Sequence, residues 1–438
     1  MSTMTRIANT VAAMLAMAAA AGAVLVGSGL VGTALAQDTI TALVGATVHP
    51  VDGDPIENGI VLVEGSNIAA IGAGVEIPAN AEVVDVAGSH IYPGFVHPLS
   101  SLGLTEIGSV AGTVDTTEMG AINAALRVEV AFNHDSALLP VNIAGGILTT
   151  HTVPSGGLIR GTSAVMNMDG WSWEDMTIKA PAAMHIDFPA GAVDDSDNDD
   201  LKKIESVLDA ARDWHKAMQA FEAGNAPRPP RNAQLEALVP LIEGQLPLFL
   251  YAGKEDQILA ALDWAEGQAF ERVIVVGGPD LQYVAERLAA DGIPAILNGV
   301  YTMPTRRWEA YDMAYQAAGK LFEAGVKFAI GDGGGGFGAA NARNLPFQAG
   351  SSAAFGMPKD AALKSVTLWP AEILGIDDQL GSLAAGKRAS LIVTSGDPLE
   401  PMTQIRRVWI DGKEYDLKRS KHRQLFERYK GRIQGEAE

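Results

Sequence analysis

Apolar and polar positions divide the chain into zones with different periods. Between residues 40 and 87, short apolar runs such as Ile60–Val63 alternate with turn sequences such as Asp52–Pro55, a pattern typical of strands joined by tight turns. The same pattern returns near the C-terminus in Ala389–Val393 and Val408–Lys413. Each strand-rich block is too small to form a full core alone, so we expect the two blocks to pair.

Between these blocks, from about Pro93 to Asp377, strand-like apolar runs alternate with segments of helical spacing. Leu246–Tyr251 and Arg272–Gly278 are two such runs, and Val326–Asp332 ends the series. This alternation predicts a parallel sheet covered by helices, and the zone has a length that suits an eight-stranded barrel with insertions. No Gly-x-Gly-x-x-Gly turn follows the first strand, which disfavours a doubly wound sheet.

The first 36 residues have the pattern of a signal peptide. Arg6 supplies the positive charge, Ile7–Val31 is an uncharged apolar run, and Ala34-Leu35-Ala36 is a cleavage site of small residues. The sequence therefore predicts export to the periplasm or the medium, with no stable membrane insertion after cleavage. The alternative is an uncleaved anchor, because the run approaches the ~20 residues that cross a bilayer.

Composition narrows the classes of function. The net charge of −20 argues against nucleic acid as a partner, because phosphates require a basic surface. The chain has no cysteine, which excludes disulfides, thiolate metal sites and cysteine nucleophiles. No Gly-x-Ser-x-Gly sequence is present, so a serine hydrolase of that type is not expected.

Several motifs together resemble one family. Tyr92–Leu104 contains Pro93-Gly94-Phe95 and opens the middle zone, Pro154–Gly157 follows its second strand, and Thr367–Gly375 and Gly381–Leu391 lie near its end. These segments resemble the amidohydrolase superfamily, nearest to its exported imidazolonepropionase-like branch. The resemblance extends from about Thr41 to Lys413.

The resemblance implies an α/β fold, a (β/α)8 TIM-like barrel with a small composite β-sandwich built from both chain ends. The expected parts are a signal peptide (1–36), the sandwich (38–92 with 379–416), the barrel (93–378), and a C-terminal helix and tail (417–438). Reacting groups in such a barrel lie at the C-terminal ends of the strands. The chemistry therefore depends on the residues at those ends.

The residues at those ends depart from the family pattern. The family holds its catalytic metal with histidines after strands one, five and six and an aspartate after strand eight. In this chain the strand-one positions fall on Leu99 and Ser101, the strand-five position on Tyr251, and the strand-six position on a glycine. Leucine cannot bind a metal and a neutral serine is a poor zinc ligand. Only the strand-eight acid has a counterpart, Asp332.

We therefore expect no metal at the family's usual site. Asp332 and His97 are the candidate catalytic residues, as a metal-free acid–base pair. The alternative for Asp332 is a turn aspartate in a glycine-rich loop, which local hydrogen bonds would explain. His97, His151 and Asp332 could also form a relocated zinc site, although no sequence spacing supports one. Each histidine alone is more often a structural residue.

Four further residues are candidates for substrate binding: Ser101, His151, Arg160 and Tyr251. Arg160 lies in the loop Pro154–Ser163, where it could hold an anionic group together with backbone N–H groups, or could pair with an acid of this chain. These two roles are weighted equally. His134 and His185 show no partner pattern.

The resemblance implies a hydrolase of carbon–nitrogen bonds other than peptide bonds, acting on a small molecule, with the usual metal site degraded. The alternative is a catalytically inactive binding subunit, or a partner subunit of a metal-bearing homologue. An oligomer with itself or with that homologue fits both hypotheses.

Overall fold

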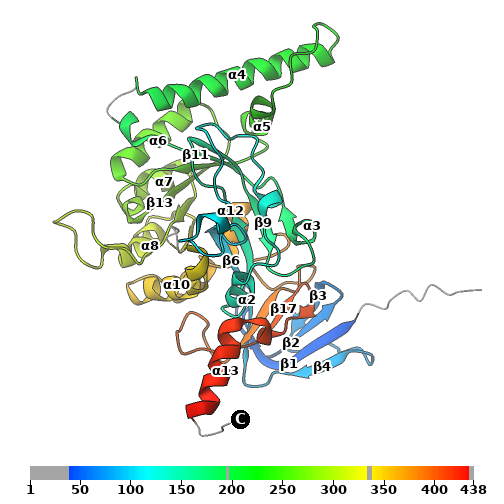
Figure 1. The fold of residues 1–438 in the computed structure, drawn as a ribbon. Helices are drawn as coiled ribbons and strands as arrows, with labels where there is room; N and C mark the ends of the chain where they lie inside the picture. The colour runs from blue at the N-terminus through cyan, green and yellow to red at the C-terminus, as the bar shows by residue number, and fades with distance from the viewer. Residues whose placement is uncertain (1–38, 194–196, 333–337, 434–438) are drawn as a thin grey trace, which may run out of the picture. The chain divides into compact units, whose positions relative to one another are not determined.

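The computed structural model describes residues 39–193, 197–332 and 338–433, and those from Ile40 onward form one compact unit. The expected signal peptide lies outside the described residues. Within them, no helix combines the length and the apolar character needed to cross a membrane. The fold is mixed α/β, and its named strands form three sheets (Figure 1).

The first sheet combines strands from both ends of the chain. Its order is β18-β17-β16-β5-β1-β2-β3, and β4 pairs with β1. The two ends join where β5 pairs antiparallel with β16, in the register Tyr92 to Ile392. The strands are β1 Ile40–Val48, β2 Ile56–Glu64, β3 Asn67–Gly72, β4 Glu82–Asp85, β5 His90–Pro93, β16 Leu391–Thr394, β17 Ile405–Ile410 and β18 Lys413–Glu414.

Buried apolar residues from both chain ends hold this sheet together. Leu43 and Ile91 from the first block and Leu391 and Trp409 from the second belong to one hydrophobic cluster, and each is at most 2% exposed. Because burying each such side chain contributes about 1.5–3 kcal/mol, each block stabilises the other. The strand pairing gives one continuous sheet; the sandwich and the domain boundaries stay predictions.

The middle of the chain supplies the other two sheets. One has the order β10-β9-β7-β6 and the other β15-β14-β13-β12-β11-β8, and β11 to β15 run parallel. The strands are β6 Phe95–Ser100, β7 Ile147–Thr152, β8 Ile159–Thr162, β9 Ala164–Asn167, β10 Thr177–Lys179, β11 Met184–Asp187, β12 Leu248–Tyr251, β13 Val273–Gly277, β14 Ala295–Leu297 and β15 Phe328–Ile330.

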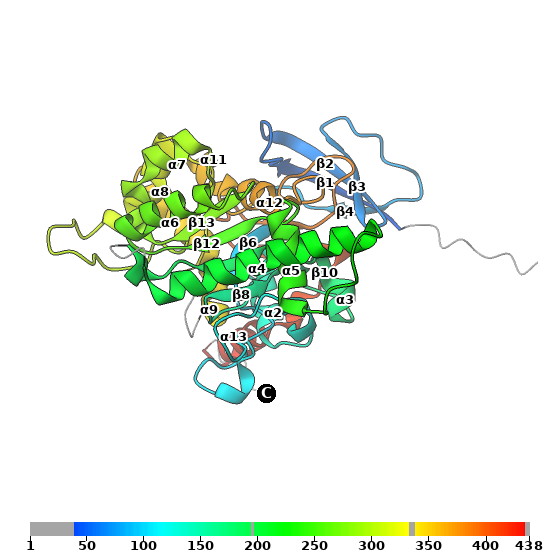
Figure 2. The ribbon, with the colours of Figure 1, turned by 90° about the horizontal axis from the view of Figure 1, so that it is seen from above.

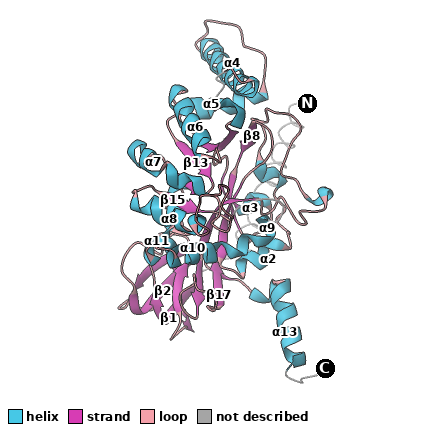
Figure 3. Ribbon diagram, turned by 90° about the vertical axis from the view of Figure 1, so that its left-hand side faces the viewer, coloured by secondary structure: helices cyan, strands magenta, loops and turns pink. Residues whose placement is uncertain are grey.

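Helices follow the parallel strands and pack beside the six-stranded sheet, as Figure 3 shows for α6, α7 and α8. Figure 2 shows α4 extending across the fold near α5. The α-helices are α2 Leu138–Ile143, α3 Trp173–Met176, α4 Asp199–Glu222, α5 Ala233–Ile242, α6 Glu255–Gly267, α7 Ala285–Asp291, α8 Met313–Glu323, α9 Gly338–Asn341, α10 Leu345–Ala354, α11 Lys359–Lys364, α12 Leu368–Leu374 and α13 Lys421–Ile433.

The strand pairs do not by themselves close a barrel, because the two middle sheets remain separate in the pairing. A few backbone hydrogen bonds link the two sheets at both borders, directly at one and through an irregular segment at the other. Ser163 N–H donates to the Ala183 carbonyl at 3.0 Å on one side. On the other side, Val96 N–H donates to the Val366 carbonyl at 2.9 Å, and Ile330 N–H to that of Ser365 at 3.1 Å. The irregular segment 365–366 therefore bridges β6 and β15.

The C-terminal helix starts later than the expected boundary at residue 417. Leu417–Arg419 form a separate 3-10 turn, capped by the Asp416 side chain, which accepts from Lys418 N–H at 2.9 Å. Only from Lys421 does the chain continue as α13. An aspartate that bonds a backbone N–H two residues on favours a local turn over a continuous helix.

Candidate functional site

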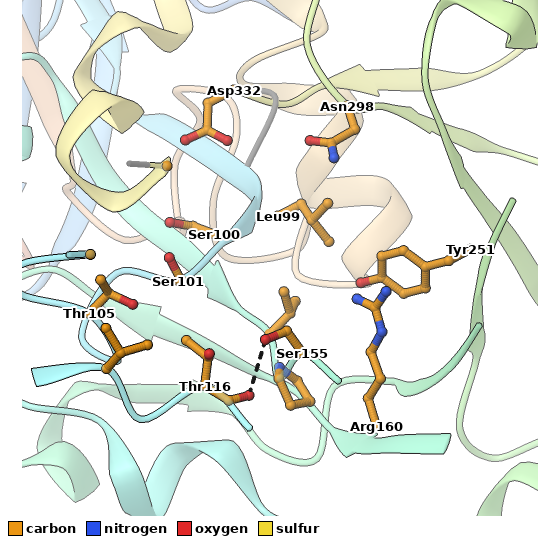
Figure 4. Close-up of a pocket in the computed structure, with 15 residues that line it drawn as sticks. Leu99, Ser100, Ser101, Thr105, Thr116, Ser155, Arg160, Tyr251, Asn298 and Asp332 are labelled. Carbon is orange, nitrogen blue, oxygen red and sulfur yellow. Dashed lines mark hydrogen bonds between the residues drawn. The ribbon is translucent and has the colours of Figure 1, made fainter. Parts of the chain in front are cut away.

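A cavity of about 360 Å³ lies at the C-terminal ends of the middle strands (Figure 4). The segment at the end of β6 forms part of its wall, and residues at the end of β12 and after β14 and β15 form another part. More of its surface is apolar than polar, and the lining includes Leu99, Ser100, Ser101, Thr105, Val114, Thr116, Val153, Pro154, Ser155, Arg160, Tyr251, Asn298 and Asp332. The sequence-predicted residues Ser101, Arg160, Tyr251 and Asp332 are thus brought to one cavity.

Asp332 and His97 lie in contact beneath this cavity. His97 Nε2 is 3.4 Å from Asp332 Oδ2, and the two side chains are 0% and 1% exposed. His97 Nδ1 accepts from the Leu99 N–H at 3.3 Å, so the proton of a neutral ring belongs on Nε2, the nitrogen nearer the carboxylate. Asp332 lines the cavity and His97 does not. His97 therefore acts on the cavity only through Asp332.

Tyr251, at the end of β12, connects two further side chains of the site. Its hydroxyl is 2.9 Å from His185 Nδ1, and the Arg160 guanidinium lies over its ring with the central carbon 3.5 Å from the ring centroid. Arg160 also donates from Nε and Nη2 to the two oxygens of Asp187, the second at 2.5 Å. Of the two roles expected for Arg160, pairing with an acid of this chain is the one observed.

Burial sets the charge states around Tyr251. Desolvation raises the pKa of the Tyr251 hydroxyl well above its usual value, so the phenol keeps its proton. Desolvation, with smaller contributions from His151 and Arg160, lowers the pKa of His185 well below 6.5. Both groups are therefore neutral at pH 7, and the Arg160–Asp187 pair is the local charged element.

His151 lies in the core, away from the cavity. Its Nδ1 donates to the Pro98 carbonyl at 2.7 Å, and its Nε2 is 2.7 Å from the Ser163 hydroxyl, which therefore donates to it. The ring also packs edge-on against Phe249, with centroids 5.0 Å apart. Desolvation lowers the pKa of His151 to about 4. Because both nitrogens are engaged, His151 has no free position for a substrate.

The side chains present do not fit the metal that the fold family implies. By the resemblance in the sequence, Leu99 and Ser101 fall at two of the family's ligand positions, and Tyr251 keeps its proton and bonds to His185. Zinc takes thiolate, imidazole or carboxylate, and of these the cavity lining offers only the carboxylate of Asp332. Among the described residues, no three His, Asp or Glu side chains are placed to hold a metal, so the relocated set with His97 and His151 is not formed.

Sequence reasoning missed three residues of the site. Asn298 directly follows β14 and lines the cavity, so the rule that strand ends carry the chemistry could have found it. Asp187 and His185 come from β11, and their partners, Arg160 and Tyr251, lie 27 and 66 positions away in the chain. No local pattern signals such distant pairs.

Comparisons with known proteins agree with this architecture. Residues 251–415 match the model of the amidohydrolase family. A segment of 72 residues is 40% identical to amidohydrolase tasK from Hapsidospora irregularis. It covers 16% of this chain and 7% of that protein, so the chain spans a small part of this relative's length.

Solved structures match over most of the chain. An amidohydrolase from Thermotoga maritima is 25% identical with a TM-score of 0.79, and the match covers 86% of this chain and 99% of that one. An adenosine deaminase from Xanthomonas campestris with bound zinc is 16% identical with a TM-score of 0.52, covering 91% and 99%. A prolidase is 18% identical with a TM-score of 0.53, covering 86% and 100%.

The fold and the strand-end cavity thus define a mixed α/β protein with amidohydrolase-like structural neighbours from the TIM-barrel superfamily. Within that class, residues 251–415 match the model of the amidohydrolase family. Tyr251, Asn298 and Asp332 lie in this matched segment.

Proposed function

We propose that this chain is an amidohydrolase-family hydrolase that cleaves carbon–nitrogen bonds other than peptide bonds in a small molecule and works without the family's metal centre. The observation that carries the proposal is Asp332, which lines the cavity at a strand end and contacts His97 at 3.4 Å. The structural neighbours include hydrolases, a prolidase and an adenosine deaminase, which support a hydrolase role in general.

The expected barrel supports this placement. We assign its eight strands to β6, β7, the continuous β8–β9 segment, β11, β12, β13, β14 and β15, closed by the backbone hydrogen bonds at Ser163 and at residues 365–366. Under this assignment Tyr251 ends strand five and Asp332 follows strand eight. The imidazolonepropionase-like branch and the β-sandwich of the two chain ends belong to the same proposal.

The reaction uses residues that the cavity provides. Asp332 takes a proton from water while the water oxygen bonds to the carbon of the substrate C–N group. The amide of Asn298 can donate an N–H to the oxygen on which charge develops. Asp332 then returns the proton to the departing nitrogen as the C–N bond breaks, which leaves an acid and an amine. His97 positions the carboxylate and does not touch the substrate.

A metal-bound hydroxide has no part in this scheme, because the residues at the family's ligand positions are Leu99, Ser101, a glycine and a protonated Tyr251. The absence of a cofactor is part of the proposal, as are export to the periplasm or medium and the lack of a nucleic-acid partner. Ser101 and Arg160 line the cavity and are proposed to contact the substrate; His151 is proposed to be structural.

The test is a hydrolysis assay of the purified chain on a panel of cyclic amides, N-acyl compounds and ureas, with and without a metal chelator. Asp332→Asn should reduce kcat by about 10²–10⁴-fold, because it removes the general base. His97→Gln should reduce kcat less and shift the pH profile. Asp377→Asn, at an exposed acid, is the control. Activity that chelation abolishes and zinc restores would refute the proposal.

A catalytically inactive binding or partner subunit is the second candidate. It is favoured by Leu99, which is 6% exposed and fills a ligand position with an apolar side chain. This candidate predicts that the chain binds compounds of the same panel without turning them over, and that it co-purifies from its native cell with a metal-bearing homologue. A chain recovered alone, with turnover that depends on Asp332, would exclude it.

A further inference from the structure

A second hollow of about 680 Å³ adjoins the cavity that Asp332 lines. Thr116 and Pro154 line both spaces, so the two spaces meet at these residues, which we call the ridge. Figure 4 shows Thr116 beside Ser155 at this border, and the Thr116 carbonyl accepts the Ser155 N–H at 2.7 Å. A ligand that is too long for the first cavity would enter the second hollow across this ridge.

The wall of the second hollow comes mainly from the segment 101–137, which joins β6 to α2. A connection well beyond about 12–15 residues is usually functional or disordered. This one is held in place, because the Leu126 carbonyl accepts the Thr162 N–H at 2.9 Å and the Ala125 N–H donates to the Gln234 side chain at 2.9 Å. These bonds tie the segment to β8 and α5, so the wall exists before a ligand arrives.

The hollow exposes apolar side chains to solvent. Met119 is 95% exposed and Val130 is 57% exposed, and Leu126 in the same lining is partly buried. The lining also carries charges of both signs, so it does not select a ligand by its net charge. Exposed apolar residues with a polar rim are typical of ligand-binding grooves, and methionine adapts its shape to what it contacts. The hollow therefore suits an apolar chain.

The size of the first cavity explains why a ligand would need the second hollow. At about 360 Å³, the first cavity is near the lower end of the range of about 300–1,000 Å³ for ligand pockets. It therefore holds the reacting group and little more. The adjoining hollow, at about 680 Å³, has room for a substituent larger than that group.

We propose that the substrate carries a linear apolar chain that crosses the ridge and lies against Met119 and Val130, while its C–N group stays beside Asp332. The inference rests on the proposed function and adds the class of substrate, amides with an acyl or alkyl chain of medium length. Each CH₂ group that leaves water for the apolar wall strengthens binding up to about fourfold. Affinity should therefore rise with chain length until the hollow is filled.

Two series of amides test the proposal on the purified full chain. One series is the p-nitroanilides of acetic, butyric, hexanoic and octanoic acid, and the other is N-methyl-, N-butyl- and N-octylacetamide. Calorimetry measures the dissociation constant of each compound, and release of the amine measures kcat/KM. In at least one series, the longest compound should bind about 30-fold or more tightly than the shortest.

A pair of substitutions in the hollow shows where the chain lies. Met119→Asn with Val130→Asn should reduce the ratio of affinities between the longest and the shortest compound about tenfold. Met402→Asn with Val83→Asn is the matched control, since Met402 is 90% and Val83 58% exposed outside the hollow, and it should leave the ratio unchanged. Circular dichroism verifies that each variant is folded.

Binding and turnover together separate this inference from the proposed function. Tighter binding of longer chains that depends on Met119 and Val130, without hydrolysis, would support the chain site and refute the proposed function. Hydrolysis that requires Asp332, with affinity and rate independent of chain length, would do the reverse. A length effect that the double substitution leaves unchanged, or no binding of any compound, would overturn the inference.

Discussion

Acid should destabilise this protein through His151. The imidazole is fully buried in β7, its Nδ1 donates to the Pro98 carbonyl, and its Nε2 accepts from the Ser163 hydroxyl. A proton on Nε2 would face the serine oxygen in place of its hydrogen and would put a charge in the core. Burial therefore lowers the pKa of His151 from 6.5 to about 4.

The direction in which stability changes with pH depends on which state, folded or unfolded, takes up the proton at the higher pH. The unfolded chain takes up the proton near pH 6.5, and the folded chain only near pH 4. The contribution of neutral His151 to the free energy of unfolding is fully present above pH 6.5 and is lost as the pH falls toward 4. At about 1.4 kcal/mol per pH unit, the loss is about 2 kcal/mol at pH 5 and about 3 kcal/mol at pH 4.

Urea unfolding followed by tryptophan fluorescence at pH 7.5, 6 and 5 measures this effect. His151→Gln keeps a hydrogen-bonding amide but cannot titrate, so the variant should be less stable at pH 7.5 and the gap to the native chain should narrow by about 2 kcal/mol at pH 5. Surface carboxylates and His185 titrate in both proteins, so their effects on stability cancel when the variant is compared with the native chain. Parallel pH profiles for the two proteins would refute the reasoning.

Two further predictions rest on single contacts. Gly412→Ala should lower the free energy of unfolding by about 2 kcal/mol or more, because φ is 75° and an added Cβ would lie 1.9 Å from the Gly65 carbonyl oxygen; an unchanged urea midpoint would contradict this. Asp187→Asn should lower the free energy of unfolding by about 1 kcal/mol, a small amount because its ion pair with Arg160 is partly exposed. The same substitution should weaken ligand binding at the cavity. Calorimetry measures both effects, and unaltered affinity would show that Arg160 needs no carboxylate.

The middle strands were predictable because their signal is local. Leu246–Tyr251 and Arg272–Gly278 contain β12 and β13, whose central residues are buried, so both read as continuous apolar runs. The mixed α/β class is confirmed in this way. Barrel closure has no such signal, because it depends on hydrogen bonds such as that of Val96 to Val366, which join distant and irregular segments.

The sequence predicted residues of the site only where their place at the end of a strand brings them to the cavity. Tyr251 and Asp332 reach the cavity because they end or follow strands, and the same rule applied to β14 would have given Asn298. His185 was misjudged because its partner, Tyr251, comes from a neighbouring strand. His151 follows the strand pattern equally well, yet it faces the core, since adjacent strand residues alternate between faces and the sequence does not say which face holds the cavity.

The side chains around Tyr251 explain why one substitution would not rebuild a metal site. A histidine at this position would remove the hydroxyl that bonds His185 and the ring under Arg160, so a buried imidazole and a guanidinium would both lose a partner. An unsatisfied buried polar group costs about 1–3 kcal/mol. Arg160 would also stand beside the incoming cation. Tyr251 is therefore tied into a network of neutral histidines and one ion pair, and a single substitution at this position would disturb the whole network.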